Sequence, residues 1–516
     1  HILVLWAARK LARPVRWTAT RSESFLSDYH ARDNFTRVDL ALDKQGRFLG
    51  LKVRTSANLG AYLAFNTPHS PTNNLGGLSG VYTTPAIHAE VLGVFTHTQP
   101  TAPYRGAGRP EATYAIERVI DMAAQEMGID RVELRRRNLI PASAMPYDTG
   151  FLFVYDTGEF EKNMDTAIKR ADYAGFEARR SAAQARGMLR GISVVNAIEI
   201  AGGPFRNTNE EGAEIRFDPG GGVTVLMGTQ NHGQGHETAF RQMAVEFLGV
   251  RPEGVRVVSG DTDTVRHGRG TFGSRSAMAG GLALRRAADK VIARARQMAA
   301  HLLDAEPDQI EFDEGTFRVR DANRNIRIED IARASYTRGK LPLDWDMGLG
   351  EQAIVVPPEA NFPNGVHVCE VEVDPKTGRA SIENYVVVDD VGTEVNPMLV
   401  KGQIHGGIAQ GIGQAAGEEI VFDPESAQLL TGSFMDYPMP RASDLPMIEI
   451  VSNPVPSTNN ALGIKGAGEA GAVGALPAYM NAVIHALAPL GVRHLDMPAS
   501  PYRIWQAIDE ASRKSA

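Results

Sequence analysis

The sequence predicts a mixed α/β fold of the α+β class, in which several mixed sheets are flanked by helices. Some segments alternate apolar and polar residues as strands do, and others repeat apolar residues at helical spacing. A chain of 516 residues is too long for one ordinary domain, so about two to four are expected. A hydrophobic fraction of 43% is typical of a globular protein with a large core.

Helices and strands are predicted along the whole chain. In order, they are a helix at 1–12, two strands within 35–62 around a turn at 44–46, a helix at 111–129, a connecting helix at 160–187, a strand at 221–228, a helix at 237–250, a strand at 254–261, a long helix at 278–304, a hairpin at 366–390 and a helix at 476–492. The order between 221 and 261 is that of a β–α–β unit. The connecting helix is rich in charge and alanine, and it predicts domains at 1–160 and 161–516.

Composition excludes several classes of protein. A formal net charge of -7 argues against a nucleic-acid-binding surface. No uninterrupted apolar run approaches the ~20 residues that a membrane-spanning helix needs, so no membrane span is predicted. Cys369 is the only cysteine, which excludes an intramolecular disulfide, a cysteine-based zinc site and an iron–sulfur cluster held by this chain. Redox chemistry would therefore need a bound organic cofactor or another subunit.

The chain opens with a histidine inside a helix-like run, HILVLWAARKLARPV. We expect that its N-terminus is truncated, and that a signal peptide or a preceding domain belongs to the full protein. A cytoplasmic location is expected, and export to the periplasm is the alternative.

Gly466, Gly468 and Gly471 have the G-x-G-x-x-G spacing of a dinucleotide-binding loop. That loop requires a strand running directly into the first glycine. Here the upstream strand PMIEIVS is followed by NPVPSTNNALG before Gly466. The dinucleotide-binding interpretation is therefore rejected.

Five segments are rich in glycine, namely 103–112, 228–240, 260–281, 395–415 and 463–474. Loops of this kind offer many backbone N–H donors without bulk, which suits a flat, polar, anionic ligand such as a pterin with a pyrophosphate tail. For any single loop, a tight turn between strands is the better interpretation. Five such loops in one chain favour a shared ligand.

Other polar clusters favour structural roles. His232 and His236 have the spacing of a helical zinc site, but the glycines between them would destabilise that helix by about 1 kcal/mol each. Asp261 and Asp263 end a strand and are expected to shape a turn. The arginine run 135–137 is expected to be a solvated helix face or a subunit contact.

The five glycine-rich segments resemble, in the same order, those of the molybdenum hydroxylase large subunits. That family contains xanthine dehydrogenase, aldehyde oxidase and aerobic carbon monoxide dehydrogenase. RPVRWTATRSE at 13–23 and RRRNLIP at 135–141 are also similar to family landmarks, and the resemblance covers nearly the whole chain. It implies two elongated molybdopterin-binding domains with the cofactor between them. The metal would be held by the dithiolene of molybdopterin, without a protein ligand, and bacterial members usually carry the cytosine dinucleotide form.

The resemblance also implies roles for individual residues. Glu469 matches the catalytic glutamate, and Gln234 matches the glutamine that hydrogen-bonds an oxo ligand of molybdenum. The residues implied in cofactor binding are Gly233 and Gly235, Arg105, Gly106 and Ala107, Thr271, Gly273, Ser274, Arg275 and Ser276, and Gln403 and Gly468. A carboxylate in hydrogen-bond reach of the attacking hydroxyl can act as a general base, worth about two to four powers of ten in rate. Without the resemblance, a lone glutamate in a glycine-rich loop would more often be solvated.

One position departs from the carbon monoxide dehydrogenases, which carry a copper-binding cysteine in the loop aligned with 104–109. Gly106 stands at that position, so no copper ligand is evident and carbon monoxide oxidation is not expected. Ala107 stands where xanthine-oxidising relatives have a bulky aromatic residue. An aldehyde or an N-heterocycle is therefore the expected substrate. Carbon monoxide dehydrogenase and a non-enzymatic, cofactor-carrying relative are the alternatives.

The resemblance implies partner subunits as well. These are an iron–sulfur small subunit with [2Fe-2S] clusters and an FAD-binding medium subunit, in a dimer of heterotrimers. The family has a Gly-Gly-Gly-Phe-Gly-type loop near molybdenum that lies upstream of where this chain begins. It is therefore open whether the chain binds cofactor by itself.

Overall fold

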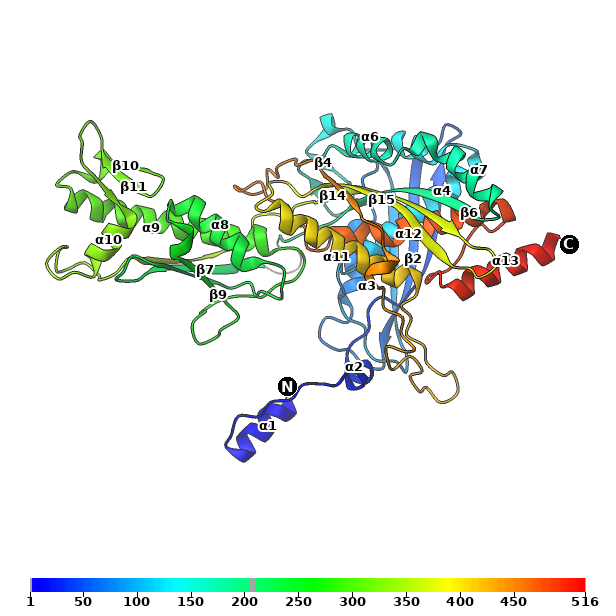
Figure 1. Ribbon diagram of the computed structural model, residues 1–516, viewed down its shortest axis with the longest axis horizontal. Coiled ribbons are helices and arrows are strands. Elements are labelled where there is room, and N and C mark those ends of the chain that lie inside the picture. The colour runs from blue at the N-terminus through cyan, green and yellow to red at the C-terminus, as the bar shows by residue number, and fades with distance from the viewer. Residues whose placement is uncertain (1, 204–208, 516) are drawn as a thin grey trace.

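The computed structural model describes residues 2–203 and 209–515, which form two lobes lying side by side (Figure 1). Residues 211–355 form the smaller lobe, and most of the remaining described chain forms the larger one. Both lobes contain sheets with packed helices, which confirms the predicted mixed α/β class. The first helix, α1 (Ile2–Leu11), has no buried residue.

The smaller lobe is built on a four-stranded sheet. The strand order is β13 (Gly350–Val355), β7 (Glu211–Phe217), β8 (Val223–Met227) and β9 (Val255–Ser259). β8 and β9 are parallel and are connected by α8 (His236–Leu248), which confirms the predicted β–α–β unit. The long helix α9 (Gly281–Leu302) packs its alanine-rich face against this sheet. The lobe is completed by β10 (Ile310–Asp313), β11 (Thr316–Val319), β12 (Asn325–Arg327) and α10 (Ile328–Ser335).

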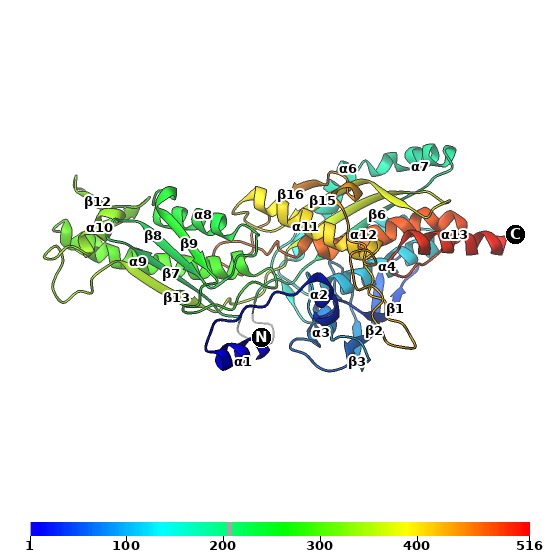
Figure 2. The ribbon, with the colours of Figure 1, turned by 60° about the horizontal axis from the view of Figure 1, so that its bottom comes forward.

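The larger lobe is built on a second four-stranded sheet that is buried on both faces. The strand order is β16 (Glu449–Ser452), β15 (Ala380–Asp390), β14 (Asn364–Val373) and β6 (Leu189–Ile198), and β14 and β15 form the predicted hairpin. One face packs against α6 (Phe160–Arg170) and α7 (Phe176–Ala185), and the other against α12 (Ala470–Leu487) and α11 (Pro397–Ala416) (Figure 2). Because both faces are covered, the neighbours Val386 and Val387 belong to different hydrophobic cores. This explains why residues on both faces of β14 and β6 are buried.

A third sheet comes from the N-terminal part of the chain. It consists of β1 (Asn34–Leu42), β2 (Phe48–Gly60) and β3 (Ile87–Phe95), with β1 and β2 antiparallel around the predicted turn. Helix α4 (Arg109–Met127) contacts both β1 and α12. The remaining named elements are α2 (Arg21–Ser27), α3 (His69–Asn73), α5 (Arg131–Arg136), α13 (Pro501–Ser515), β4 (Tyr147–Asp148) and β5 (Val154–Tyr155).

One hydrophobic core contains residues from both sides of the predicted boundary at 160 and 161. Ile116 and Ile120 of α4 share this core with Met164 of α6 and Val366 of β14. The connecting helix is in fact two helices, α6 and α7. The division into 1–160 and 161–516 stays a prediction.

The segment 395–415 is helix α11, so its interpretation as a glycine-rich loop is wrong. Its glycines allow α12 to pack closely. A Cβ on Gly407 would lie 2.9 Å from the backbone nitrogen of Ala472, and a Cβ on Gly471 would lie 2.4 Å from the carbonyl oxygen of Ile404. The close helix contact compensates for the ~1 kcal/mol that each glycine costs in a helix.

Helix α12 begins six residues earlier than predicted, immediately after Glu469. The span Ala470–Leu490 is long and apolar enough to cross a membrane, contrary to the expectation that no segment would be. However, 78% of the 18-residue apolar stretch within this span is buried inside the protein. It is the central helix of the larger lobe and contacts β6, β14, α11 and α4.

The expectation of a solvated arginine run at 135–137 is wrong for Arg135, whose side chain is completely buried. Its guanidinium lies 2.8 Å from a carboxylate oxygen of Glu117 and 2.9 Å from one of Asp121. A buried charge is tolerated only when it is paired, and these carboxylates supply the pairing. Apolar spacing alone did not reveal them.

Candidate active site

Glu469 lies at the N-terminal capping position of α12, where loops from both lobes meet. Its backbone N–H donates a hydrogen bond to the Ser274 hydroxyl oxygen at 3.0 Å. Its carboxylate Oε2 lies 2.9 Å from Nη2 of Arg109. The Glu469 side chain is 14% exposed, so the carboxylate is largely shielded from solvent but still accessible.

The turn before α4 directs Arg109 toward this carboxylate. Gly108 has a φ of 104°, and a Cβ there would lie 2.3 Å from the carbonyl oxygen of Ser70, so only glycine fits. Ala107 also has a positive φ, of 44°, and its carbonyl accepts a hydrogen bond from Nδ2 of Asn73 at 2.9 Å. A non-glycine residue in this conformation is uncommon and is held there by its surroundings.

Arg105 ties the loop of Glu469 to α11. Its Nε donates to the carbonyl oxygen of Gly468 at 2.5 Å, and its Nη2 donates to the carbonyl oxygen of Gln403 at 2.9 Å. Burial lowers the pKa of Arg105, and the nearby Glu469 opposes this shift. The structure therefore brings together Arg105, Gln403, Gly468 and Glu469, which were predicted from three separate segments.

A second carboxyl group, Glu199, lies beside Glu469 and was not predicted. It follows β6, is 1% exposed, and its Oε1 lies 3.7 Å from Nη2 of Arg109. Burial and then the proximity of Glu469 raise the pKa of Glu199 to about 8, although Arg109 opposes the shift. The only sequence signal was a glutamate directly after a long apolar strand.

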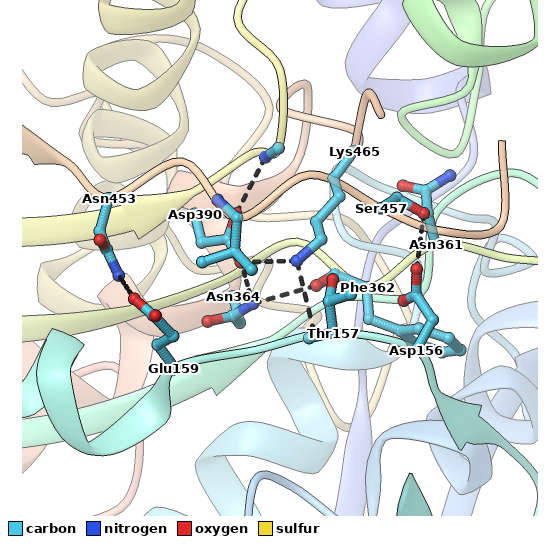
Figure 3. A network of polar contacts seen from close by, with 12 residues as sticks. Asp156, Thr157, Glu159, Asn361, Phe362, Asn364, Asp390, Asn453, Ser457 and Lys465 are labelled. Carbon is cyan, nitrogen blue, oxygen red and sulfur yellow. Dashed lines mark hydrogen bonds and ion pairs between the residues drawn. The ribbon is translucent and has the colours of Figure 1, made fainter. Parts of the chain in front are cut away.

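The loop that carries Glu469 is anchored beneath the site by a buried ion pair (Figure 3). Nζ of Lys465 lies 2.5 Å from Oδ2 of Asp390, and both side chains are fully buried. Asn364 donates to the same Oδ2 at 3.0 Å. One residue after the lysine, the N–H of Gly466 donates to Oδ1 of Asn361 at 2.9 Å. These contacts hold the loop against the ends of β14 and β15, and neither the lysine nor the aspartate was predicted to do so.

The loop at 270–276 connects the two lobes around Glu469. Ser274, which binds the Glu469 backbone, has a φ of 50°. Ser276 donates to the Thr271 hydroxyl oxygen at 3.3 Å, and Thr271 donates to the carbonyl oxygen of Gln230 at 2.5 Å. Polar contacts thus run from Glu469 toward the neighbouring loop of the smaller lobe.

The buried side chain of Arg275 points into the protein and stabilises its own loop. Its guanidinium forms a buried ion pair with Glu211 and donates to the carbonyl oxygens of Asn209 and Glu210 at 2.8 and 2.9 Å. These donors are already committed to protein acceptors. A direct role of Arg275 in cofactor binding stays a prediction.

Gln234 lies on the loop between β8 and α8. Its Nε2 donates to the carbonyl oxygen of Gln230 at 3.3 Å, and within 2–203 and 209–515 it has no hydrogen bond to Glu469. A Cβ on the adjacent Gly235 would lie 2.6 Å from Cδ2 of Leu399, which brings this loop against the start of α11. The role predicted for Gln234 stays a prediction.

The site fits a bulky polar cofactor. Gly233, Gly270 and Gly273 have positive φ, and a Cβ on any of them would meet no atom within 4 Å, so their loops border open space. Oγ1 of Thr229, a buried polar atom on one of these loops, has no hydrogen-bond partner in the described chain. In that part of the chain, no three His, Cys, Asp or Glu side chains form a group that could hold a metal ion.

Comparisons with known proteins agree with this geometry. Two family models, both described as a molybdopterin cofactor-binding domain, match residues 1–139 and 166–446. The chain is 35% identical to the carbon monoxide dehydrogenase large chain of Hydrogenophaga pseudoflava, over 99% of this chain and 65% of that protein. It is 34% identical to subunit gamma of the 6-hydroxypseudooxynicotine dehydrogenase complex of Paenarthrobacter nicotinovorans, with the same coverage of each chain. It therefore spans just under two thirds of the length of these relatives.

Solved structures show the same relationship. A Cu,Mo-CO dehydrogenase superposes with a TM-score of 0.92 at 33% identity, covering 99% of this chain and 66% of that chain. Quinoline 2-oxidoreductase from Pseudomonas putida 86 superposes with a TM-score of 0.92 at 34% identity and the same coverage.

Proposed function

Since this chain belongs to the molybdopterin cofactor-binding domain family, together with the large chains of carbon monoxide dehydrogenases and the molybdenum-binding subunits of xanthine dehydrogenases, we propose that it is the catalytic large subunit of a molybdenum hydroxylase. The proposed reaction oxidises a small organic substrate with oxygen from water. The observation that carries the proposal is the partly buried carboxylate of Glu469, paired with Arg109 and bordered by glycine-rich loops.

We propose that the cofactor is the cytosine dinucleotide form of Mo-molybdopterin, bound by the loops at 228–235, 270–276 and 463–469. When bound, it supplies the oxidising centre and the water-derived oxygen. The loops contribute backbone N–H donors and space without side-chain bulk. Gln234 would donate a hydrogen bond to a cofactor oxygen, and Gly233 and Gly235 would let the backbone approach.

Glu469 is proposed to act as the general base. Its Oε2 would accept the proton of the attacking hydroxyl group, and Arg109, whose Nη2 lies 2.9 Å away, holds the carboxylate in place. Arg105 holds the carbonyl of Gly468 and so orients the loop. The lysine–aspartate anchor beneath the loop limits its movement, and such fixed geometry is a large part of enzymatic rate acceleration.

An N-heterocycle or an aldehyde is the proposed substrate. Quinoline 2-oxidoreductase and nicotine 6-hydroxylase, whose names contain N-heterocycles, are among the similar proteins. Ala107, in the turn before α4, is small where xanthine-oxidising relatives are expected to carry a bulky aromatic residue. Carbon monoxide oxidation is the alternative, favoured by the 35% identity to a carbon monoxide dehydrogenase.

The backbone at Gly106 argues against that alternative. Gly106 has a φ of 100°, and a Cβ there would lie 2.3 Å from Cγ of Pro110. A cysteine at this position would be strained and would clash with the proline ring. No thiolate is therefore available at Gly106 to bind copper. The second alternative, a non-enzymatic cofactor carrier, would not require the paired carboxylate at Glu469.

We propose that the electrons leave through partner subunits, because Cys369, the only cysteine of this sequence, is a buried core residue of β14. The relatives are one chain of larger enzymes, such as subunit gamma of a dehydrogenase complex. We propose an iron–sulfur small subunit with [2Fe-2S] clusters and an FAD-binding medium subunit, in a dimer of heterotrimers located in the cytoplasm.

The test of the proposed base is Glu469→Gln in the full-length protein with its partners. The amide keeps the size of the side chain but cannot accept the proton, so we expect turnover to fall by about two to four powers of ten while molybdenum content is unchanged. Turnover is measured with quinoline and an aromatic aldehyde, and molybdenum by elemental analysis. Normal turnover in the molybdenum-loaded variant would contradict the proposal.

A further inference from the structure

Glu199 is a buried carboxyl group to which the proposed mechanism gives no role. It is 1% exposed, and its polar neighbours are the hydroxyl of Ser274, the carboxylate of Glu469 and the guanidinium of Arg109, whose Nη2 lies 3.7 Å away. A buried carboxylate without a close ion pair is strongly disfavoured in its ionised form, whereas the neutral acid is tolerated. Its surroundings therefore favour the protonated form.

Of the two cations that the described residues place at the site, Arg109 lies closer to Glu469 than to Glu199, and Arg105 donates its hydrogen bonds to other groups. Nη2 of Arg109 lies 2.9 Å from the Glu469 carboxylate but 3.7 Å from that of Glu199. Arg105, the other cation facing both carboxyl groups, directs its donors to the carbonyl oxygens of Gly468 and Gln403 and to Gln side chains of α11. The hydroxyl of Ser274, also beside Glu199, accepts the backbone N–H of Glu469.

Two carboxyl groups that share one close guanidinium cannot both ionise at low cost, because their charges repel. Glu199, which is buried and lies farther from this guanidinium, is the group that keeps its proton. The raised pKa of Glu199 agrees with this order, since burial and Glu469 are its two largest causes.

We propose that Glu199 is a positioning residue for Glu469: a neutral carboxyl group that keeps its proton while Glu469 is ionised, and that shares the Arg109 guanidinium with it. Because Glu199 is neutral, it does not compete with Glu469 for the guanidinium of Arg109. Arg109 therefore stays bound to the Glu469 carboxylate and keeps it oriented as the base. The two carboxyl groups then lose their protons in two coupled steps that belong to the pair. This inference rests on the proposed role of Glu469 as the base.

The direct test is infrared spectroscopy of the holoenzyme at a series of pH values, comparing the native protein with Glu199→Gln. We expect the native protein to show a C=O stretching band of a protonated carboxyl group that disappears on ionisation near pH 8 and is absent from the variant. Asp389→Asn is the matched control. Burial and Asp390 raise the pKa of Asp389 to about 7, so this control should remove a different band and leave that of Glu199 unchanged. Identical carboxyl bands in the native protein and Glu199→Gln would overturn the proposal.

A second variant keeps the test decisive if Glu199→Gln does not fold. In Glu469→Gln the negative neighbour of Glu199 is removed, so the carboxyl band should lose its intensity at a lower pH than in the native protein. A band that ionises at the same pH would overturn the coupling. This readout does not depend on turnover, so it separates failure of the inference from failure of the proposed function.

Kinetics distinguish positioning from a purely structural role. In Glu199→Gln we expect kcat to fall about fivefold to tenfold, as when a single hydrogen-bonded contact in a site is weakened, with KM and molybdenum content unchanged. In the native enzyme kcat should change near pH 8, where Glu199 ionises, and this change should be absent from the pH dependence of kcat in Glu199→Gln. A fall in molybdenum content that accounts for all of the lost activity would contradict the positioning role.

Discussion

A carboxylate is a useful base only while it is ionised and held in place, and single residues around Glu469 serve both needs. Arg109 supplies a positive charge at 2.9 Å, and the positive φ of Gly108 makes the turn that brings it there. Glu199 limits the negative charge in the same pocket by favouring its neutral form. These contacts join residues hundreds of positions apart, so no local pattern in the sequence could reveal them.

The buried ion pair of Lys465 and Asp390 is expected to stabilise the folded protein. Lys465→Met leaves Asp390 buried without its cation, and breaking a buried pair in this way costs about 3–5 kcal/mol. We expect the free energy of unfolding, measured with denaturant on the full-length protein, to fall by about that amount.

The double variant Lys465→Met with Asp390→Asn is the control for the charge. It removes both members of the pair and leaves no uncompensated charge, so it should be more stable than the single variant. Equal stability of the two variants would show that packing, and not the ion pair, anchors the loop.

At the scale of elements, the contact between α11 and α12 determines where Glu469 lies, because the glutamate caps α12 and Arg105 reaches across to α11. The glycines of 395–415 looked like a loop because glycine is a poor helix former. Their actual role depends on the facing helix, which a single sequence does not show. The β–α–β unit and the β14–β15 hairpin were predictable, because the alternation of their residues follows local geometry.

Gly471→Ala tests this helix contact. A Cβ at position 471 would lie 2.4 Å from the carbonyl oxygen of Ile404, so α12 must move away from α11 and carry Glu469 with it. We expect stability to fall by about 1–3 kcal/mol, the usual cost of overpacking, and turnover to fall with it. Both are measured on the full-length protein, by unfolding and by steady-state kinetics.

The matched control is Gly402→Ala, on an exposed position of the same helix α11. No atom lies within 4 Å of its added Cβ, and alanine is the better helix former by about 1 kcal/mol. This variant should therefore be slightly more stable and fully active. If the two alanine variants behave alike, close packing of α11 on α12 does not control the site.

At the scale of the whole molecule, the site lies where loops of the smaller lobe meet α11 and α12 of the larger lobe. The resemblance of five segments to one family predicted which loops take part, and the structure places Arg105 in hydrogen-bond contact with Gln403 and Gly468, beside Glu469. The resemblance did not predict Glu199, Lys465 or the lobe formed by 211–355, because these depend on how distant segments pack. The predicted α/β class needed only local periodicity and length, and it is confirmed.

This chain is proposed to carry molybdenum chemistry without copper. Elemental analysis of the full-length protein, purified with its proposed partner subunits from a host that makes the cofactor, tests this. We expect molybdenum in equal amount to the chain and no copper, because Gly106 offers no thiolate and no room for one. Copper in equal amount to molybdenum would contradict the hydroxylase proposal and favour carbon monoxide oxidation, and absence of molybdenum would favour a non-enzymatic relative.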